Sequence, residues 1–176
     1  SIVCIILFSP VMLLSAILVK ATSKGPLIFA QERVGLHNKP FQMYKFRTMY
    51  VQTEEEEQKG WTKKNDPRVT KIGKFIRKHS IDEFPQFLNV FLGQMSVVGP
   101  RPPLPNEVAE YTEFDLQRLA VKPGITGLWQ VTDRNDTDFD GMVRRDLEYI
   151  AKRGLLFDLK IVVLTVFEVF SGEGAS

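Results

Sequence analysis

The sequence has few of the residues that build disulfides, histidine metal sites or polyanion-binding surfaces. It contains one cysteine, Cys4, and two histidines, His37 and His79. One cysteine cannot form an intrachain disulfide, which favours a reducing, cytoplasmic-side location. Two histidines exclude a histidine-rich zinc site. Lysine and arginine exceed the acids by only 23 to 21, so the chain lacks the cationic excess of a general nucleic-acid binder.

Common cofactor motifs are also missing. The chain contains no dinucleotide-binding glycine fingerprint, no Walker A loop and no HExxH sequence, which argues against nicotinamide dehydrogenases, P-loop enzymes and zinc metalloproteases. A chain of 176 residues is expected to form one domain with its own core. Its composition, 44% hydrophobic and 25% charged, is globular.

The longest apolar run, residues 2–19, carries no charge and is followed by Lys20 and Lys24. As a helix it would be about 27 Å long, the lower limit for spanning a bilayer. Pro10 removes a helical hydrogen bond, and Ser9 can satisfy the freed carbonyl. A straight span, a kinked helix that enters and leaves by one face, and a buried core helix remain open. Because the chain opens inside this run, we expect it to be part of a longer protein.

Beyond this run the residue pattern predicts more helix than strand. Residues 27–33 and 41–47 are rich in aromatic and β-branched residues and predict a β-hairpin with a long loop. An apolar helix is predicted at 84–92, another helix at 106–122, and a third from Asp138 or Asp140 to Arg153. The apolar stretch 155–170 is expected to lie in the membrane interface or to pack under the N-terminal segment.

Charge is unevenly distributed along the chain. Residues 54–57 are four consecutive glutamates within a polar stretch, which we interpret as a solvated excursion, with metal binding as the alternative. Residues 63–78 contain seven cations, and their apolar residues recur at the spacing of a short amphipathic helix. Its basic face could bind anionic lipid headgroups or a diphosphate, or simply be solvated. The apolar N-terminal run favours the membrane interpretation.

Two adjacent carboxylates, Asp82 and Glu83, directly follow the basic run. Carboxylates suit Mg²⁺, which usually joins one or two of them to substrate phosphates, and an aspartate can be the nucleophile of a phosphoryl transfer. The structural alternative is helix capping, with Ser80 as N-cap and Glu83 at N3, or with Asp82 as N-cap. The residues alone leave both interpretations open. Together with the apolar run they suggest phosphoryl transfer at a membrane surface.

Five longer motifs follow one another along the chain. They are Phe46-Arg47-Thr48-Met49, Asp66-Pro67-Arg68-Val69-Thr70, Ser80-Ile81-Asp82-Glu83-Phe84-Pro85-Gln86, Met95-Ser96-Val97-Val98-Gly99-Pro100-Arg101-Pro102 and Lys122-Pro123-Gly124-Ile125-Thr126-Gly127-Leu128-Trp129-Gln130-Val131. With these motifs the chain resembles the bacterial sugar transferases, the monotopic polyprenyl-phosphate phosphoglycosyl transferases. The resemblance covers essentially the whole chain and implies one catalytic domain, 1–176, with a re-entrant membrane helix at 1–22 and a cytoplasmic or interfacial body at 23–176.

The resemblance implies an activity and its partners. Family members transfer sugar-1-phosphate from a UDP-sugar to undecaprenyl phosphate with Mg²⁺, releasing UMP and starting a capsule, O-antigen, exopolysaccharide or glycoprotein glycan. Larger members often use UDP-glucose or UDP-galactose, so a hexose is the expected sugar. The implied location is the cytoplasmic face of the bacterial inner membrane, in contact with membrane lipids and not with nucleic acid. A homodimer is a further expectation.

The resemblance also assigns roles to individual residues. Asp82 would attack the sugar-linked phosphate and hold a covalent phosphosugar, and Glu83 would position Mg²⁺ or accept a proton. Both acids are candidate Mg²⁺ ligands. The arginines that family members place around phosphate groups correspond to Arg77, Arg101 and Arg134. A further acid near the site corresponds to Asp158. The helix-breaking pair of the re-entrant helix maps to Ser9 and Pro10.

One departure from the family pattern bears on Arg134. The family commonly has glycine before this arginine, whereas this chain has Asp133. The extra negative charge is expected to reorient a phosphate-binding loop or to change which sugar is accepted.

The expected fold is α+β and mainly helical, with a re-entrant membrane helix, a β-hairpin packed on helices, and interfacial amphipathic helices. Two other functions compete with the enzyme. A non-catalytic scaffold for glycan assembly would have no need of the intact Asp82-Glu83 pair. A peripheral lipid-binding module would depend on the basic residues of 63–78.

Overall fold

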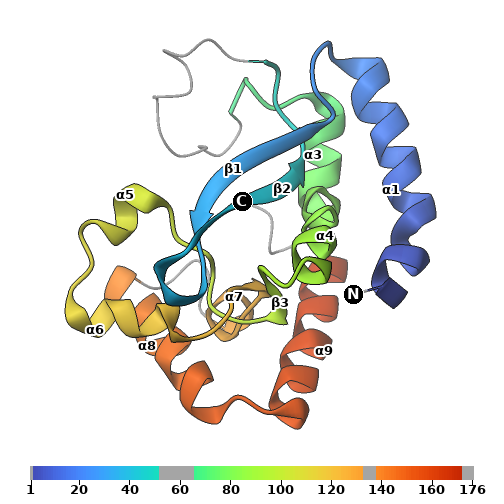
Figure 1. The fold of residues 1–176 in the computed structure, drawn as a ribbon. Coiled ribbons are helices and arrows are strands. Elements are labelled where there is room, and N and C mark those ends of the chain that lie inside the picture. The colour runs from blue at the N-terminus through green and yellow to red at the C-terminus, as the bar shows by residue number, and fades with distance from the viewer. Residues whose placement is uncertain (1, 52–65, 133–137, 172–176) are drawn as a thin grey trace.

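The structure, a computed structural model, describes residues 2–51, 66–132 and 138–171. These residues form many helices and two small sheets, which confirms the predicted mainly helical α+β fold (Figure 1). The strands are β1 (Ile28–Val34), β2 (Pro40–Phe46), β3 (Ser96–Val98) and β4 (Gly124–Thr126). The longer helices are α1 (Ile2–Thr22), α3 (Lys71–Lys78), α8 (Phe139–Lys152) and α9 (Leu155–Ser171). The shorter ones are α4 (Gln86–Phe91), α5 (Pro105–Val108), α6 (Glu113–Leu116) and α7 (Leu128–Thr132), with 3₁₀ turns η1 (Leu36–Asn38), η2 (Ile81–Glu83) and η3 (Gln117–Ala120).

The predicted hairpin is formed by β1 and β2, which pair antiparallel from Ile28 opposite Phe46 to Val34 opposite Pro40. Helix α4 is attached to β2 by one buried side chain, Asn89. Its amide donates to the carbonyl of Gln42 at 2.7 Å and accepts from the backbone N–H of Tyr44 at 3.1 Å. Because a buried amide is costly unless paired, these bonds fix α4 and the turn before it against the hairpin.

A second sheet, which the residue pattern did not predict, pairs β3 with β4 in parallel. The two backbones come so close at Gly99 and Gly124 that a Cβ atom on either glycine would overlap backbone atoms of the other segment. Behind this sheet lies a buried cluster of Val98, Leu128, Tyr149 and Ile161. The glycines therefore allow the segment that carries Arg101 to cross tightly over the core.

The helix predicted at 106–122 is wrong as a single element. The segment is divided into α5, α6 and η3. A new helix starts at Thr112, whose hydroxyl accepts from the N–H of Asp115 while the Asp115 carboxylate accepts from the N–H of Thr112. This reciprocal capping box ends the preceding turn. The prediction for α8 is confirmed, because Asp138 is its N-cap and accepts from the N–H of Gly141 at 2.9 Å.

Helix α1 runs without interruption through Pro10 and lies alongside α3 and α4 (Figure 1). The Ser9 hydroxyl donates to the carbonyl of Ile6 at 2.7 Å, the carbonyl that Pro10 cannot bond because it has no N–H. The predicted rescue by Ser9 is therefore confirmed. The ring of Phe8 packs on Phe84 and Phe87, with centroids 4.7 and 5.8 Å apart.

Most of the α1 side chains face outward. In the described part of the chain it is the one helix long and apolar enough to cross a membrane, with a mean hydropathy of 2.9 over an 18-residue stretch. Only its residues Ser15 and Val19 are buried. Further exposed apolar side chains lie on α4 and α9, among them Phe91, Leu155 and Leu156. The protein therefore exposes far more apolar surface on these helices than isolated surface residues would give.

Candidate active site

The adjacent acids Asp82 and Glu83 lie in the 3₁₀ turn η2, between α3 and α4. Both capping interpretations are wrong. Ser80 has a left-handed backbone, with φ 51°, and its side chain makes no capping bond. Helix α4 begins only at Gln86, because Pro85 has no N–H with which to continue the hydrogen bonding of the turn. The two carboxylates are thus not needed to cap a helix.

Glu83 is held by a lysine from the hairpin. The ammonium group of Lys45, on β2, lies 2.8 Å from the Glu83 carboxylate, and each side chain is 25% exposed. Asp82 is half-buried. Burial and the neighbouring Glu83 charge raise the pKa of Asp82 to about 6, although Lys45 and Arg77 act in the opposite direction. The charged form of Asp82 is therefore disfavoured. A further cation beside it, or loss of the charge when the carboxylate forms a covalent bond, would stabilise the side chain.

Arg77 reaches the acids from α3, which is fixed against the end of β2. Thr70 caps α3 by accepting from the N–H of Gly73 at 2.8 Å. A Cβ atom on Gly73 would overlap the Thr48 carbonyl, so α3 and the segment just after β2 touch through backbone. Arg77 Nε donates to the Thr48 hydroxyl at 2.7 Å. Burial lowers the pKa of Arg77, and the charge of Asp82 opposes that shift, so the arginine and the aspartate interact electrostatically.

Two more arginines meet near Glu83. Arg33, on β1, is buried and donates to the carbonyl of Pro102 at 3.0 Å. Burial and the positive charge of Arg101 lower the pKa of Arg33 to about 10. Arg33, Lys45, Glu83 and Arg101 all line one small cavity of about 20 Å³. Guanidinium groups that repel each other in this way form a favourable site for a phosphate, which would relieve the repulsion.

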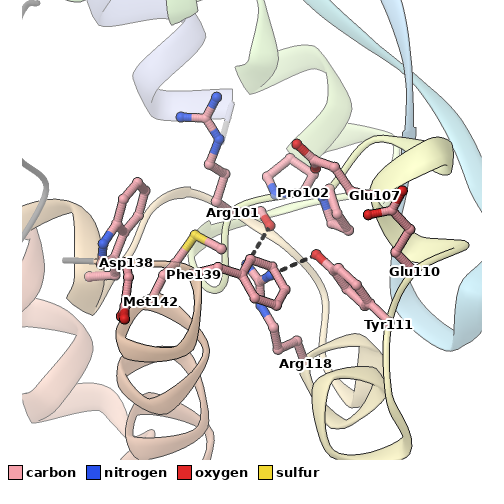
Figure 2. Close-up of a pocket in the computed structure, with 11 residues that line it drawn as sticks. Arg101, Pro102, Glu107, Glu110, Tyr111, Arg118, Asp138, Phe139 and Met142 are labelled. Carbon is pink, nitrogen blue, oxygen red and sulfur yellow. Dashed lines mark hydrogen bonds between the residues drawn. The ribbon is translucent and has the colours of Figure 1, made fainter.

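Arg101 also borders a second, larger cavity of about 610 Å³. Figure 2 shows its side chain extending away from Tyr111 and Arg118, while its backbone carbonyl faces Arg118. Arg118 forms a buried ion pair with Asp146, at 2.6 Å, and donates to the Tyr111 hydroxyl at 2.7 Å. It also lies 3.4 Å from the Arg101 carbonyl. Arg118 therefore joins the walls of the larger cavity to the Arg101 segment.

The structure brings four of the six predicted site residues together: Asp82, Glu83, Arg77 and Arg101. Asp158, in the first turn of α9, instead lies 3.0 Å from the hydroxyl of Tyr149. That hydroxyl is also 3.1 Å from the carbonyl of Val98 on β3, so the contacts of Asp158 anchor α9 to the strand before Arg101. Burial and the hydrogen bond to Asp158 raise the pKa of Tyr149 above its usual range.

Three sequence predictions fall outside the described residues: Arg134, its neighbour Asp133 and the acidic run 54–57. Within the described ranges, no cluster of three or more histidine, cysteine or acidic side chains could hold a metal ion. The adjacent pair of Asp82 and Glu83 nevertheless fits Mg²⁺, which needs one or two carboxylates when substrate phosphates supply the other ligands. Burial, together with the charge of Glu83, raises the pKa of Asp82, and a bound cation would relieve the repulsion between the two carboxylates.

Sequence reasoning missed Arg33, Lys45 and Thr48. A signal for Lys45 was present, because Phe41, Met43 and Lys45 alternate along one face of β2. The first two are core residues, so the third is a cation placed at a core-facing strand position. Such an inward charge is unusual unless it has a partner. Thr48 lies in one of the five motifs, but the motif assigns it no role, and its contact with Arg77 appears only in the structure.

Comparison with known proteins places the chain in one family. The family model described as "Bacterial sugar transferase" matches residues 1–172. The chain is 49% identical to the galactosyl transferase CpsE of Streptococcus agalactiae, over 86% of this chain and 36% of that protein. It is 46% and 44% identical to the UDP-glucose:undecaprenyl-phosphate glucose-1-phosphate transferases of Klebsiella pneumoniae and Escherichia coli, in each case over 97% of this chain and 38% of the relative. The chain thus spans somewhat more than a third of the length of these relatives. It belongs to the bacterial sugar transferase family.

Proposed function

We propose that this chain catalyses transfer of a sugar-1-phosphate from a UDP-sugar to undecaprenyl phosphate, giving undecaprenyl-diphosphate-sugar and UMP. The names of the two glucose-1-phosphate transferases describe this reaction for those relatives. The observation that carries the proposal is the environment of Asp82. Asp82 is half-buried beside Glu83, and the cations Lys45 and Arg77 act to lower its pKa against the effect of burial. Cations in this position would also stabilise the negative charge of a phosphate that a carboxylate nucleophile attacks.

The reaction is proposed to proceed in two displacements at the same phosphorus. A carboxylate oxygen of Asp82 bonds to the phosphorus that bears the sugar, and the bond from this phosphorus to the bridging oxygen breaks, so that UMP leaves with the electron pair. A phosphate oxygen of undecaprenyl phosphate then attacks the phosphosugar and displaces the Asp82 carboxylate. Dividing the transfer in this way regenerates the enzyme and leaves the number of phosphoanhydride bonds unchanged.

The remaining charged residues would bind and orient the phosphates. Arg33 and Arg101 present two guanidinium groups at the small cavity, beside Lys45 and Glu83, where they would bind the diphosphate of the donor. Asp82 and Glu83 would hold Mg²⁺, which would supply charge neutralisation for the phosphoryl oxygens. Arg77 would hold the phosphate near Asp82 through the guanidinium nitrogens that its bond to Thr48 leaves available.

We further propose a hexose donor, a start to capsule or exopolysaccharide assembly, and a location on the cytoplasmic face of the membrane. The names of the relatives above specify galactosyl or glucose transfer, which supports a hexose. The outward apolar side chains of α1, α4 and α9 support insertion into one leaflet of the bilayer. In this arrangement α1 is a re-entrant helix, and Asp82 and Glu83 lie at the membrane surface. A homodimer is part of the same proposal.

The test is UMP release from a UDP-hexose by the full-length chain in detergent, with undecaprenyl phosphate and Mg²⁺. Asp82→Asn should abolish the release, because an amide cannot act as the nucleophile. Glu113→Gln, which neutralises an exposed acid of α6, is the control and should turn over normally. Unimpaired turnover by Asp82→Asn would refute the mechanism in which Asp82 is the nucleophile. A properly folded chain that releases no UMP from any UDP-sugar would instead favour the scaffold.

A further inference from the structure

The larger cavity is separated from the acids by Arg101. It has a volume of about 610 Å³, within the range of small-molecule sites. Arg101 lines this cavity and also the small one that contains Glu83, Lys45 and Arg33. A molecule with its diphosphate at the small cavity could therefore extend past Arg101 into the larger one.

The walls of this cavity combine aromatic rings with acids. Tyr111 and Phe139 form a tilted aromatic pair with centroids 5.5 Å apart, and Trp129 contributes a third ring to the lining. The indole N–H of Trp129 is buried and has no hydrogen-bond partner in the part of the chain that the structure describes. Three carboxylates also line the cavity, Glu107, Glu110 and Asp138.

The three carboxylates are not equivalent. One oxygen of Glu107 accepts from the N–H of Leu104 at 2.7 Å, and one oxygen of Asp138 caps α8. Glu110 is exposed and its carboxylate has no bond or ion pair within the described ranges. Figure 2 shows Glu107 and Glu110 on the same side of the cavity as Tyr111. Glu110 is therefore the acid most available to a ligand.

The aromatic rings and carboxylates of the larger cavity suit one part of the sugar-nucleotide donor better than the others. Carboxylates repel a diphosphate and the carbonyl edges of uracil, but they accept hydrogen bonds from hydroxyl groups. Exposed aromatic rings, such as Phe139 at 43% exposure, offer an apolar face on which a pyranose ring can stack. A neutral group with many hydroxyls and an apolar face fits this lining better than a base or a phosphate does.

We infer that this cavity binds the hexosyl group of the sugar nucleotide, with Glu110 accepting sugar hydroxyls and Phe139 supporting the ring. The inference rests on the proposed function and adds the residues that determine which sugar is used. Arg118 is a positioning residue here, since it holds Tyr111 through its hydroxyl and is itself fixed by Asp146.

The experiment measures UMP release from UDP-glucose and UDP-galactose by the full-length chain, and inhibition by UMP, which has no hexose. Glu110→Gln and Phe139→Leu should each lower kcat/KM for the preferred donor about tenfold, as expected for replacing a charge-assisted hydrogen bond by a neutral one or for losing a ring contact. They should also change the ratio of kcat/KM between the two epimers. The inhibition constant of UMP should stay within about twofold of the wild-type value.

Two matched controls lie outside the cavity. Glu113→Gln and Phe114→Leu make the same chemical changes at exposed residues of α6 and should leave all three quantities unchanged. Variants that behave like these controls would overturn the inference. A UMP inhibition constant that rises together with the loss of kcat/KM would also overturn it, because the cavity would then bind uridine. A wild-type chain that releases no UMP from either donor would refute the proposed function itself, an outcome distinct from these two.

Discussion

Asp82 is held in an environment that disfavours its charge, and this has a consequence for stability. Burial and Glu83 raise the pKa of Asp82 from 3.8 to about 6, so folding favours the protonated form. The contribution of this group to stability is complete below pH 3.8 and is lost as the pH rises through about 6. At neutral pH the charged carboxylate of Asp82 therefore lowers the stability of the fold, as is common at functional sites.

Asp82→Asn should consequently be more stable than the wild type at pH 7, by on the order of 1 kcal/mol after allowing for partial exposure to solvent. The gain should disappear below pH 4, where the wild-type carboxyl is protonated as well. Denaturant unfolding in detergent without Mg²⁺ at several pH values measures the difference. A variant that is less stable than the wild type at pH 7 would contradict the assigned burial cost.

Thr48 provides a second prediction at the scale of single residues. Its hydroxyl accepts from Arg77 Nε, and Thr48→Val removes this bond while keeping the shape of the side chain. We expect the rate of UMP release to fall about tenfold with little change in thermal stability, because the lost hydrogen bond orients Arg77, which is proposed to bind a phosphate. Thr22→Val, which removes a hydroxyl bonded within α1, should retain the wild-type rate. Equal rates for the two variants would show that Thr48 does not position Arg77.

The sequence predicts single residues best where a long motif carries them. Asp82, Glu83 and Arg101 lie in the quoted motifs, Arg77 lies in the basic run beside them, and the structure places all four near one another. Capping by Ser80 was not realised, because Pro85 moves the helix start beyond both acids. Arg33 was not identified, since its role depends on a partner about 70 residues away along the chain, the carbonyl of Pro102.

At the scale of elements, the Arg118–Asp146 pair joins the segment that contains α6 and η3 to α8. Both side chains are 2% exposed, and two nitrogens of Arg118 lie 2.6 and 2.8 Å from the Asp146 carboxylate. Burial raises the pKa of Asp146 to about 6 despite the guanidinium beside it. The pair is therefore a costly but fully hydrogen-bonded connection, and each partner depends on the other.

Asp146→Asn should destabilise the fold by about 3 to 5 kcal/mol, because it leaves the Arg118 charge buried without a counter-ion. The double variant Arg118→Met, Asp146→Leu should recover most of this loss, since two apolar side chains need no partners. Denaturant midpoints of the three proteins test this expectation. Equal losses in the single and double variants would mean that the shape of the pair matters and its charge does not.

Which elements were predictable depends on their length and on local signals. The hairpin, α3, α8 and α9 follow periodic patterns with recognisable ends, and they occur close to the expected residues. The segment 106–122 was misread because Thr112 and Asp115 form a capping box inside an otherwise helical pattern. Strands β3 and β4 have three residues each, and their pairing depends on the close approach of Gly99 and Gly124, which no local pattern reveals.

At the scale of the whole molecule, the apolar helices would determine how the proposed site meets a membrane. Helix α1 packs on α3 and α4, the elements on either side of the turn η2 that contains Asp82 and Glu83. Exposed apolar side chains on α1, α4 and α9 place the apolar surface next to the acids. A lipid-linked acceptor could then present its phosphate to Asp82 while its chain stays in the bilayer.

Cys4 reports on this arrangement, because it lies on the N-terminal side of Pro10 in α1. A membrane-impermeant thiol reagent should label Cys4 from the cytoplasmic side if α1 returns to that face. Pro10→Ala restores the N–H that the Ile6 carbonyl lacks, and under the re-entrant proposal this variant should carry Cys4 toward the periplasmic side. Labelling of the unaltered chain from the periplasmic side alone would contradict a re-entrant helix.

Asp82 is proposed to become covalently attached to a phosphosugar. The full-length chain should be incubated with UDP-hexose and Mg²⁺ without undecaprenyl phosphate, then digested and measured by mass spectrometry. We expect the peptide containing Asp82 to gain the mass of one hexosyl phosphate, with release of one equivalent of UMP, and Asp82→Asn to show neither. A wild-type chain that turns over with acceptor but never forms this adduct would contradict the account.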